Sequence, residues 1–346
     1  MAIATDQKER KLGVSLGSRL QWSDEEFIKV VQMAESLGYH SVHVAESWGR
    51  DQFTLLTMMA RNTDRILLGT SITGMWARSP AALAQTASSL DTIANGRFIL
   101  GLGTGNLLVV EQWHGMKPER PLRRMREFIE IMRMIWRGEP LQYQGQIFKL
   151  DGRFTMAVKG PRESIPIYIG ASGPKLTQLA GELADGWLPT HTDIYRLDVL
   201  KSHLDIGAQR AGRDPSTIDI SPGFPTVVGD DIEPARQRGK EHLALYVGGL
   251  SDKYHELMVR YGFKKEADAI KDAWGKGDHK TAAAAISDEM LDHFAIMGNA
   301  EHCRKQFEVC YASGMDCPRI SFAETAPLED VFRTLEVLAP TPVGAV

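Results

Sequence analysis

The sequence predicts an α/β fold, a single (β/α)8 TIM barrel with insertions that spans residues 1–346 as one domain. Short apolar runs alternate with helical patterns along most of the chain, and short links join them. This alternation favours right-handed βαβ units and a parallel sheet. The chain is longer than a typical domain, but barrels of this kind commonly reach its length. Two doubly wound domains are the alternative arrangement.

The first half of the chain repeats one strand–helix unit four times. Its apolar runs predict strands over residues 11–16, 40–45, 65–72 and 97–103. The helical patterns run from Ser23 to Gly38, over 53–62, from Ser79 onward and over 118–138. Ser23 and Glu26 form a capping box at the start of the first helix. Pro80, and Pro174 in the second half of the chain, suit first helical positions, where the missing N–H would have no partner.

The second half continues the pattern with two interruptions. Residues 139–165 predict a small hairpin around Gln144–Gly145, outside the barrel. Residues 232–292 are polar and helical, and they predict a second insertion. The remaining strands are expected at 166–170, 185–190, 218–229 and 318–323, and the remaining helices at 174–184, 193–212, 299–313 and 327–338. Two prolines restrict the 218–229 strand to its TVVG end.

Composition and charge exclude several classes of function. The net charge is −4 and no run of five like charges occurs, so we expect no nucleic-acid or membrane-surface partner. The first residues, MAIATDQKERKLG, show no apolar h-region and no apolar stretch approaches 18 residues, so we expect a cytoplasmic protein. Cys303, Cys310 and Cys317 lack the C-x-x-C spacing of a metal or redox site, so we expect reduced thiols in the core. No H-x-H strand end occurs, and no metal site is predicted.

Residues 96–106 read GRFILGLGTGN, and the alternating glycines raise two interpretations. A dinucleotide-binding turn needs G-x-G-x-x-G with a helix that opens inside the glycines, at the first βα unit. Here the third glycine position holds Asn106, the stretch is fourth in the series, and LLVVEQWHGMKP is not expected to open a helix directly. The alternative is a barrel strand end at which bare backbone lets a flat ligand or a phosphate approach. The sequence favours the barrel strand end.

Several blocks of the sequence resemble one known family: GTSI, RSPAALAQTASSLDTIANGRFILGLGTGN, VVEQWHG and IPIYIGASGPKLTQLAGELADGW. With the barrel pattern, they are similar to the luciferase-like superfamily over about residues 11–230, and more loosely beyond. Within that superfamily they most resemble the coenzyme F420-dependent oxidoreductases related to methylenetetrahydromethanopterin reductase. The resemblance implies coenzyme F420, a deazaflavin, as the cofactor, with FMN as the alternative. It also implies a homodimer.

The resemblance implies a cofactor site at the ends of three strands. In the family, the third strand ends in a bulge with a non-proline cis peptide that supports the flavin ring, and Ser71–Ile72 is the matching pair. Thr104, Gly105 and Asn106 match the loop after the fourth strand, which borders the cofactor. The family's phosphate loop corresponds to Gly170, Ala171, Ser172, Gly173 and Lys175. There the start of the next helix offers free N–H groups to an anion.

Two cationic residues of this site have ordinary alternatives. Lys175 either adds positive charge to the phosphate loop or is solvated. Arg78, just before the helix that begins at Ser79–Pro80, either faces a phosphate or closes a surface salt bridge.

The candidate catalytic residues are Glu46, Trp48, Glu111 and His114, with Asp51 beside them. Glu46 ends the second strand, where a carboxylate holds or protonates a substrate or the flavin, or else binds neighbouring backbone. Trp48 either walls the substrate pocket or packs under a loop. Glu111 and His114 are three residues apart and could meet on one helical turn, although a hydrogen-bonded surface pair is the interpretation we favour.

Two departures from the family pattern narrow the expected reaction. The sugar-phosphate dehydrogenases of this branch carry a histidine after the second-strand acid and a glutamate after GTG, where this sequence has Ser47 and Asn106. The sequence therefore argues against sugar-phosphate oxidation. The expected function is hydride transfer between F420 and a small organic substrate. The alternatives are an FMN-dependent monooxygenase that needs a reductase partner, and a non-catalytic barrel that binds a flavin-like ligand.

Overall fold

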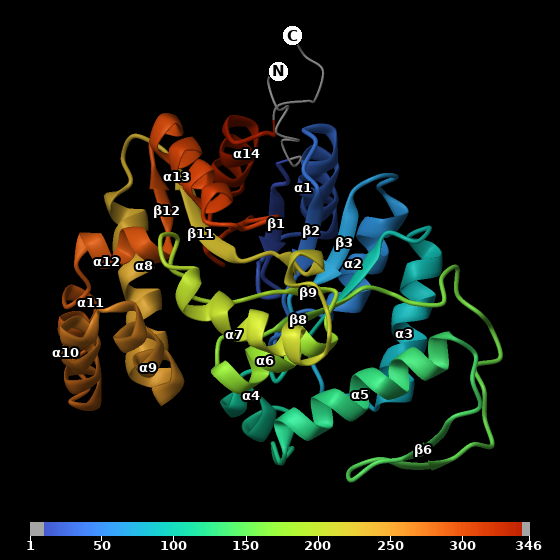
Figure 1. The fold of residues 1–346 in the computed structure, drawn as a ribbon. Helices are drawn as coiled ribbons and strands as arrows, with labels where there is room; N and C mark the ends of the chain where they lie inside the picture. The colour runs from blue at the N-terminus through green and yellow to red at the C-terminus, as the bar shows by residue number, and fades with distance from the viewer. Residues whose placement is uncertain (1–9, 341–346) are drawn as a thin grey trace, which may run out of the picture.

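The computed structural model describes residues 10–340 and shows one curled sheet wrapped by helices (Figure 1). The strands of that sheet are β1 (Gly13–Leu16), β2 (Ser41–Val44), β3 (Leu67–Thr70), β4 (Thr73–Gly74), β5 (Phe98–Gly103), β8 (Ile167–Gly170), β9 (Gly186–Trp187), β10 (Asp219–Ile220), β11 (Gly223–Val228), β12 (Ile296–Gly298) and β13 (Arg319–Ser321). Their order is β10-β9-β8-β5-β3-β2-β1-β13-β11-β12, with β4 beside β5. The pairings in this 11-stranded sheet are parallel, so the strands end at a common edge.

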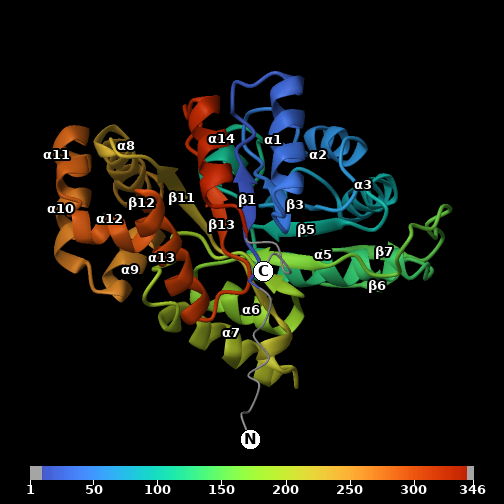
Figure 2. The ribbon, with the colours of Figure 1, turned by 90° about the horizontal axis from the view of Figure 1, so that it is seen from above.

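Helices follow most of the strands and cover the outside of the sheet (Figure 2). They are α1 (Asp24–Ser36), α2 (Gln52–Arg61), α3 (Pro80–Ile93), α4 (Leu107–Gln112), α5 (Pro121–Trp136), α6 (Pro174–Leu183), α7 (Asp198–Arg210), α8 (Glu233–Ala244), α9 (Asp252–Tyr261), α10 (Lys264–Gly275), α11 (His279–Ala284), α12 (Asp288–Phe294), α13 (Ala300–Ala312) and α14 (Leu328–Val337). A 3-10 turn, η1 (Pro215–Thr217), and a π-helix, η2 (Leu245–Leu250), complete the helical elements of the described residues.

The local start signals act as the sequence predicts. Ser23 and Glu26 form the capping box of α1, with both reciprocal hydrogen bonds present. Pro80 and Pro174 occupy the first turns of α3 and α6. The hairpin expected in 139–165 is present as the antiparallel pair β6 (Gln142–Gln144) and β7 (Lys149–Asp151), which projects past α5 (Figure 2).

The expectation of eight strands, each with its helix, is wrong in detail. The segment expected as one strand over 218–229 is two strands, because β10 pairs with β9 whereas β11 pairs with β13 and β12. Pro222 lies between them and has no N–H for a ladder hydrogen bond. The three-residue β12 was not predicted at all, because its apolar run is too short to separate from the helix that follows.

Two helix predictions also need correction. Residues 107–112 do form a helix directly after the glycines, because the Asn106 side chain accepts a hydrogen bond from the Leu108 N–H and caps it. The long helix expected from residue 118 begins at Pro121, and the helix expected from 193 begins at Asp198. The dinucleotide interpretation still fails, because β5 lies inside a curled parallel sheet as the fourth long strand of the chain.

The interior of the sheet is closely packed and partly polar. All six residues of β5 and all four of β2 are buried, as expected for parallel strands covered on both faces. Arg319 donates hydrogen bonds to the Ser221 carbonyl and the Ser15 hydroxyl, and burial lowers its pKa to about 10. Burial likewise lowers the pKa of His43 well below its usual value. Such groups are tolerated inside because they are hydrogen-bonded.

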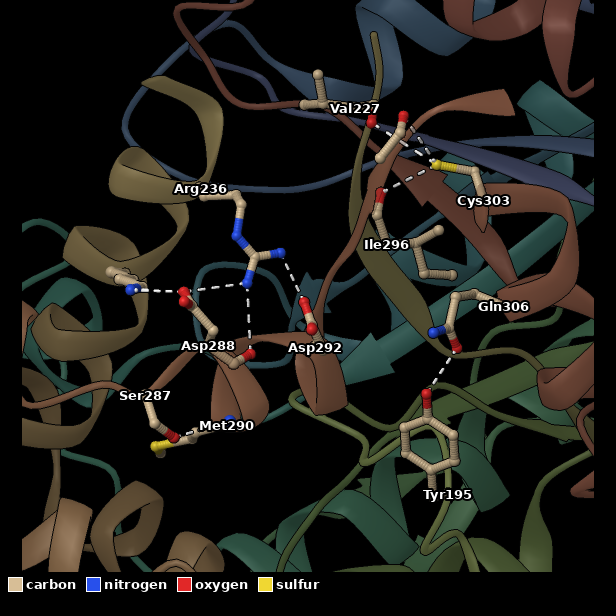
Figure 3. A network of polar contacts seen from close by, with 12 residues as sticks. Tyr195, Val227, Arg236, Ser287, Asp288, Met290, Asp292, Ile296, Cys303 and Gln306 are labelled. Carbon is tan, nitrogen blue, oxygen red and sulfur yellow. Dashed lines mark hydrogen bonds and ion pairs between the residues drawn. The ribbon is translucent and has the colours of Figure 1, made fainter. Parts of the chain in front are cut away.

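The three cysteines are buried free thiols, which confirms the expectation of reduced core residues. Burial raises the pKa of the Cys303 thiol to about 11 and that of Cys317 to about 12. The Cys303 sulfur, on α13, faces the carbonyl groups of β11 and β12 (Figure 3) and lies 3.5 Å from the Gly298 carbonyl oxygen. These thiols therefore pack as small hydrophobic groups.

Helices α8 to α12 gather on one side of the sheet (Figure 1). Arg236 on α8 links two of these helices, because it forms ion pairs with Asp292 at 2.6 Å and Asp288 at 3.1 Å on α12 (Figure 3). Lys240, one turn further along α8, also pairs with Asp288. The guanidinium is well shielded from solvent, whereas Asp288 is exposed, so the Arg236–Asp292 pair contributes more to holding α8 and α12 together than the Arg236–Asp288 pair does.

The glycines of β5 are required by packing. A Cβ at Gly101 would overlap the carbonyl oxygen of Thr70 on β3. The Thr70 hydroxyl also accepts a hydrogen bond from the Gly101 N–H and donates one to the Gly101 carbonyl. The backbones of β3 and β5 thus approach too closely for a side chain at this position.

We expect Gly101→Ala to lower the free energy of unfolding by at least about 2 kcal/mol, because the backbone of β3 must move. Gly223→Ala is the matched control, since it is also a strand glycine but its Cβ would lie 3.6 Å from its nearest neighbour. Urea unfolding of both variants gives the comparison. Equal stability of the two variants would contradict this account of the β3–β5 contact.

Candidate active site

The predicted site residues lie at the common edge where the parallel strands end. Glu46 and Trp48 follow β2, Ser71 and Ile72 follow β3, and residues 104–106 follow β5. Residues 170–175 run from the end of β8 into α6. One edge of the sheet thus brings together segments that are more than 100 residues apart in sequence.

Ile72 forms the centre of this edge. The peptide bond between Ser71 and Ile72 is cis, as expected. The Ile72 side chain lies between two glycines: a Cβ at Gly103 would overlap its Cδ1, and a Cβ at Gly170 would lie 2.7 Å from its Cγ2. Larger residues at either strand end would displace Ile72. The glycines at the ends of β5 and β8 therefore make room for the bulge that follows β3.

Glu46 is held by two neighbours. Its Oε2 accepts a 2.7 Å hydrogen bond from the Gly74 N–H, and its Oε1 accepts one of 2.6 Å from Arg78. Arg78 also pairs with Asp51 at 3.1 Å and lies over the Phe53 ring. One guanidinium thus engages both carboxylates. The arrangement fits the structural alternatives for Glu46 and Arg78, a carboxylate bound to backbone and a salt bridge.

The segment from Gly170 to Lys175 ends at an open helix terminus. Gly173 is the N-cap of α6, and no side chain caps the helix. A Cβ at Gly173 would meet no atom within 4 Å, and Lys175 is exposed. The Ser172 hydroxyl is engaged with Thr190, to whose carbonyl it donates at 2.9 Å. The first N–H groups of α6 therefore remain available to an acceptor from outside the helix.

The loop after β5 uses its polar groups locally. The Thr104 carbonyl accepts a 2.8 Å hydrogen bond from the Trp76 indole, and the Asn106 side chain caps α4. Gly105 has a φ of 65°, a left-handed conformation that glycine adopts without strain. This loop is positioned by its own contacts beside Gly103.

The remaining candidates are on the surface. Trp48 is 50% exposed, with the Arg19 guanidinium 4.0 Å from its ring centre. Glu111 is exposed in the last turn of α4, and His114 lies beyond the end of that helix. No hydrogen bond joins these two within residues 10–340, so the favoured interpretation as a hydrogen-bonded surface pair is wrong. The helix ends at Gln112, with Trp113 as its C-cap, before His114 can complete a turn with Glu111.

The sequence analysis missed a group of rings near this edge. His191 follows β9, and its ring lies within 6.4 Å of those of His242, Tyr246 and Tyr254 from the helical segment. The one signal in the sequence was the four-residue spacing of His242 and Tyr246, which places them on one helix face. Nothing in the sequence joins them to His191, about 50 residues earlier.

A separate open hollow of about 490 Å³ lies at the ends of β11 and β12, between Asp230 and His302. None of the predicted site residues lines it, and its Asp288 and Asp292 are already paired with Arg236 and Lys240. We therefore place the candidate site at the Ile72 edge, where the glycines and the open helix terminus meet. Within the described residues, no group of three or more metal-ligating side chains is assembled. Nor is any described helix both long and apolar enough to span a bilayer.

Comparison with known proteins identifies one family. The model of the luciferase-like monooxygenase family matches residues 16–317. A protein of Mycobacterium tuberculosis named for a coenzyme F420-dependent oxidoreductase is 34% identical over 338 residues, which cover 93% of this chain and 97% of the relative. The 5,10-methylenetetrahydromethanopterin reductase of Archaeoglobus fulgidus is 33% identical and covers 84% of this chain and 87% of its own length.

A solved structure agrees with these sequence matches. The coenzyme F420-dependent tetrahydromethanopterin reductase of Methanopyrus kandleri superposes with a TM-score of 0.82 and 25% sequence identity. The alignment covers 96% of this chain and 97% of that one. The curled parallel sheet is therefore shared along nearly the full length of both chains.

The Glu46–Arg78 contact gives a stability prediction. We expect Arg78→Ala to lower the free energy of unfolding by about 1–3 kcal/mol, because a shielded carboxylate loses its charged partner. The exposed Arg196–Asp198 pair supplies the control, and Arg196→Ala should change stability by less than about 0.5 kcal/mol. Chemical denaturation measures both. An Arg78 variant as stable as the Arg196 variant would show that the Glu46 contact contributes nothing to folding.

Proposed function

Because the chain belongs to the luciferase-like monooxygenase family, we propose that it is a coenzyme F420-dependent oxidoreductase that transfers a hydride between F420 and a small organic substrate. The relatives that cover most of this chain at 33% and 34% identity carry names of F420-dependent enzymes or of a methylenetetrahydromethanopterin reductase. F420 is therefore the cofactor we assign.

The observation that carries this proposal is that residues 170–173 both contact Ile72 and begin a helix with no side-chain cap. Gly170 packs against Ile72, and three residues later Gly173 opens the uncapped α6. A flat ring over Ile72 would thus lie a short distance from N–H groups suited to an anion. A cofactor that combines a ring system with a phosphate fits both features.

The residues of the chain then have distinct tasks. When bound, F420 supplies or accepts a hydride at its C5 carbon. Ser71 and Ile72 support the ring, and the loop of Thr104, Gly105 and Asn106 borders it. Ala171, Ser172 and Gly173 present backbone to the phosphate, with the charge of Lys175 nearby. We assign Arg78 to holding Glu46 and Asp51 rather than to the phosphate, because both carboxylates already engage it.

The strand pairing also supports a (β/α)8 barrel as the fold. We interpret β10 and β11 as two parts of the seventh strand of a (β/α)8 barrel, since one pairs with β9 and the other with β13. Residues 139–165 and 232–292 are then insertions in a single domain. A homodimer in the cytoplasm stays a prediction.

The second candidate is an FMN-dependent monooxygenase, which the description of the matching family favours. Parallel binding titrations of the purified protein with F420 and FMN separate the two. We expect tighter binding of F420. A preference for FMN by about tenfold, or about 1.4 kcal/mol, would overturn the proposed cofactor. Binding of neither would overturn both cofactor assignments.

The phosphate assignment gives a second prediction. Gly173→Val should raise the dissociation constant for F420 at least about tenfold, because a branched side chain blocks approach to the α6 N–H groups. The melting temperature should stay near that of the parent, since no atom lies within 4 Å of the new Cβ.

Gly275→Val is the matched control, because Gly275 is equally free of neighbours and ends α10. It should leave F420 affinity unchanged. If Gly173→Val binds F420 as well as the parent does, the phosphate is held elsewhere.

A further inference from the structure

Four ring side chains form a wall beside the candidate site, which we call the ring wall: His191, His242, Tyr246 and Tyr254. The His191 ring centre is 4.4 Å from that of Tyr246 and 5.0 Å from that of Tyr254. His242 and Tyr246 are 4.8 Å apart. His191 follows β9 at the edge where the strands end, so the wall joins that edge to the helical segment of α8, η2 and α9.

His191 combines a left-handed backbone conformation with an unpartnered ring nitrogen. Its φ is 51°, in the left-handed region where glycine is unstrained and a side chain costs free energy. Its Nδ1 is buried and has no hydrogen-bond partner within the described residues. The neighbouring Thr192 Oγ1 is buried and unpartnered as well. Unpartnered buried polar atoms are rare in folded proteins, so His191 and Thr192 are held in place at a cost in free energy.

The ring of His191 is neutral and can adapt its hydrogen bonding. Desolvation, with a contribution from His242, lowers the pKa of His191 to about 3. The residue is only half-buried, and Nε2 is not among its buried, unpartnered atoms, so this nitrogen reaches the surface. No partner fixes the tautomer from the Nδ1 side. Nε2 can therefore donate to a carbonyl or accept from a hydroxyl.

The helical segment is shaped to present Tyr246 to this ring. Tyr246 lies in the π-helix η2, and π-helical turns are frequent at functional sites. Gly248 and Gly249 of the same turn pack directly against Trp274 on α10, where a Cβ would come within 2.7 Å of that side chain. The glycines of the π-helical turn thus let it pack closely against Trp274, and the same turn places Tyr246 in the ring wall.

The charges that border the ring wall compensate one another. Arg19, after β1, pairs with Glu324, after β13, and its guanidinium lies over Trp48. Arg19 is close enough to reinforce the desolvation that lowers the pKa of His242. Glu324 and Arg19 have opposing effects on Tyr246, whose pKa desolvation raises. The wall therefore offers flat rings and hydrogen-bonding edges without an unpaired charge.

We propose that the ring wall binds the substrate of the proposed oxidoreductase, and that this substrate is a flat, uncharged, conjugated ring compound with a carbonyl that accepts a hydrogen bond from His191. The inference rests on the proposed function for the reaction. The ring class follows from the four ring side chains, which contact one another at tilted and edge-to-face angles and are stacked only between His191 and His242. The lack of charge follows from the neutral histidine and the paired Arg19, since an anion would select an unpaired cation. His191 binds and orients the carbonyl and supplies no proton of its own.

Menadione, an uncharged quinone with two ring carbonyls, is a suitable probe for the F420-loaded protein. His191→Gly removes the ring and also relieves the left-handed backbone. We expect the dissociation constant for menadione to rise at least about tenfold, or about 1.4 kcal/mol, with the melting temperature unchanged or higher. His191→Asn, which tolerates the same backbone and keeps a hydrogen-bonding group, should give an intermediate affinity. The F420 affinity should be the same in all three proteins.

His302→Ala is the control, because His302 lines the separate hollow at β11 and β12. It should leave menadione binding unchanged. An affinity that falls in His302→Ala but not in His191→Gly would place the substrate in that hollow and overturn the inference. So would a parent protein that binds F420 but not menadione. In both cases the F420 assignment stands, whereas failure of the parent to bind F420 refutes the proposed function instead.

Discussion

The packing of Ile72 between two glycines is the constraint on which the candidate site depends. Gly103 and Gly170 end neighbouring strands, and neither can carry a side chain while Ile72 occupies its position. This contact fixes the bulge after β3 against β5 and β8 at once. The backbone of β8 then continues directly into α6, so the place of the helix terminus follows from the place of Ile72. A platform for a flat ring and a terminus for an anion are therefore set by a single packing arrangement.

Much of the fold follows from local signals that a sequence displays. The capping box of Ser23 and the prolines at 80 and 174 act within one helical turn, and the structure confirms them. The errors occur where pairing or capping depends on other segments. The split of 218–229 results from its different neighbours on the two sides, and β12 exists because β11 offers it an edge. α4 was not predicted because Asn106 was interpreted as part of the loop that borders the cofactor and not as the N-cap of a helix.

The site shows the same division. That strand-end residues would gather at one edge could be predicted, because all the strands were expected to be parallel. Which hydrogen bonds and ion pairs those residues form with one another could not be predicted. Arg78 had two possible partners in the sequence analysis, and only the folded chain shows it between Glu46 and Asp51. His191 gave no signal, since its left-handed backbone and its neighbours from η2 and α9 arise only from tertiary packing.

A crystal structure of the protein with F420 tests the central claim most directly. The account predicts the deazaflavin ring against Ile72, beside Gly103 and Gly170, and the phosphate at the N-terminus of α6, within hydrogen-bond distance of the Gly173 backbone. The ring wall of His191, His242, Tyr246 and Tyr254 should remain open toward the exposed face of the deazaflavin ring. A phosphate bound by Arg78, or a deazaflavin ring stacked on Tyr246 instead of Ile72, would contradict the account.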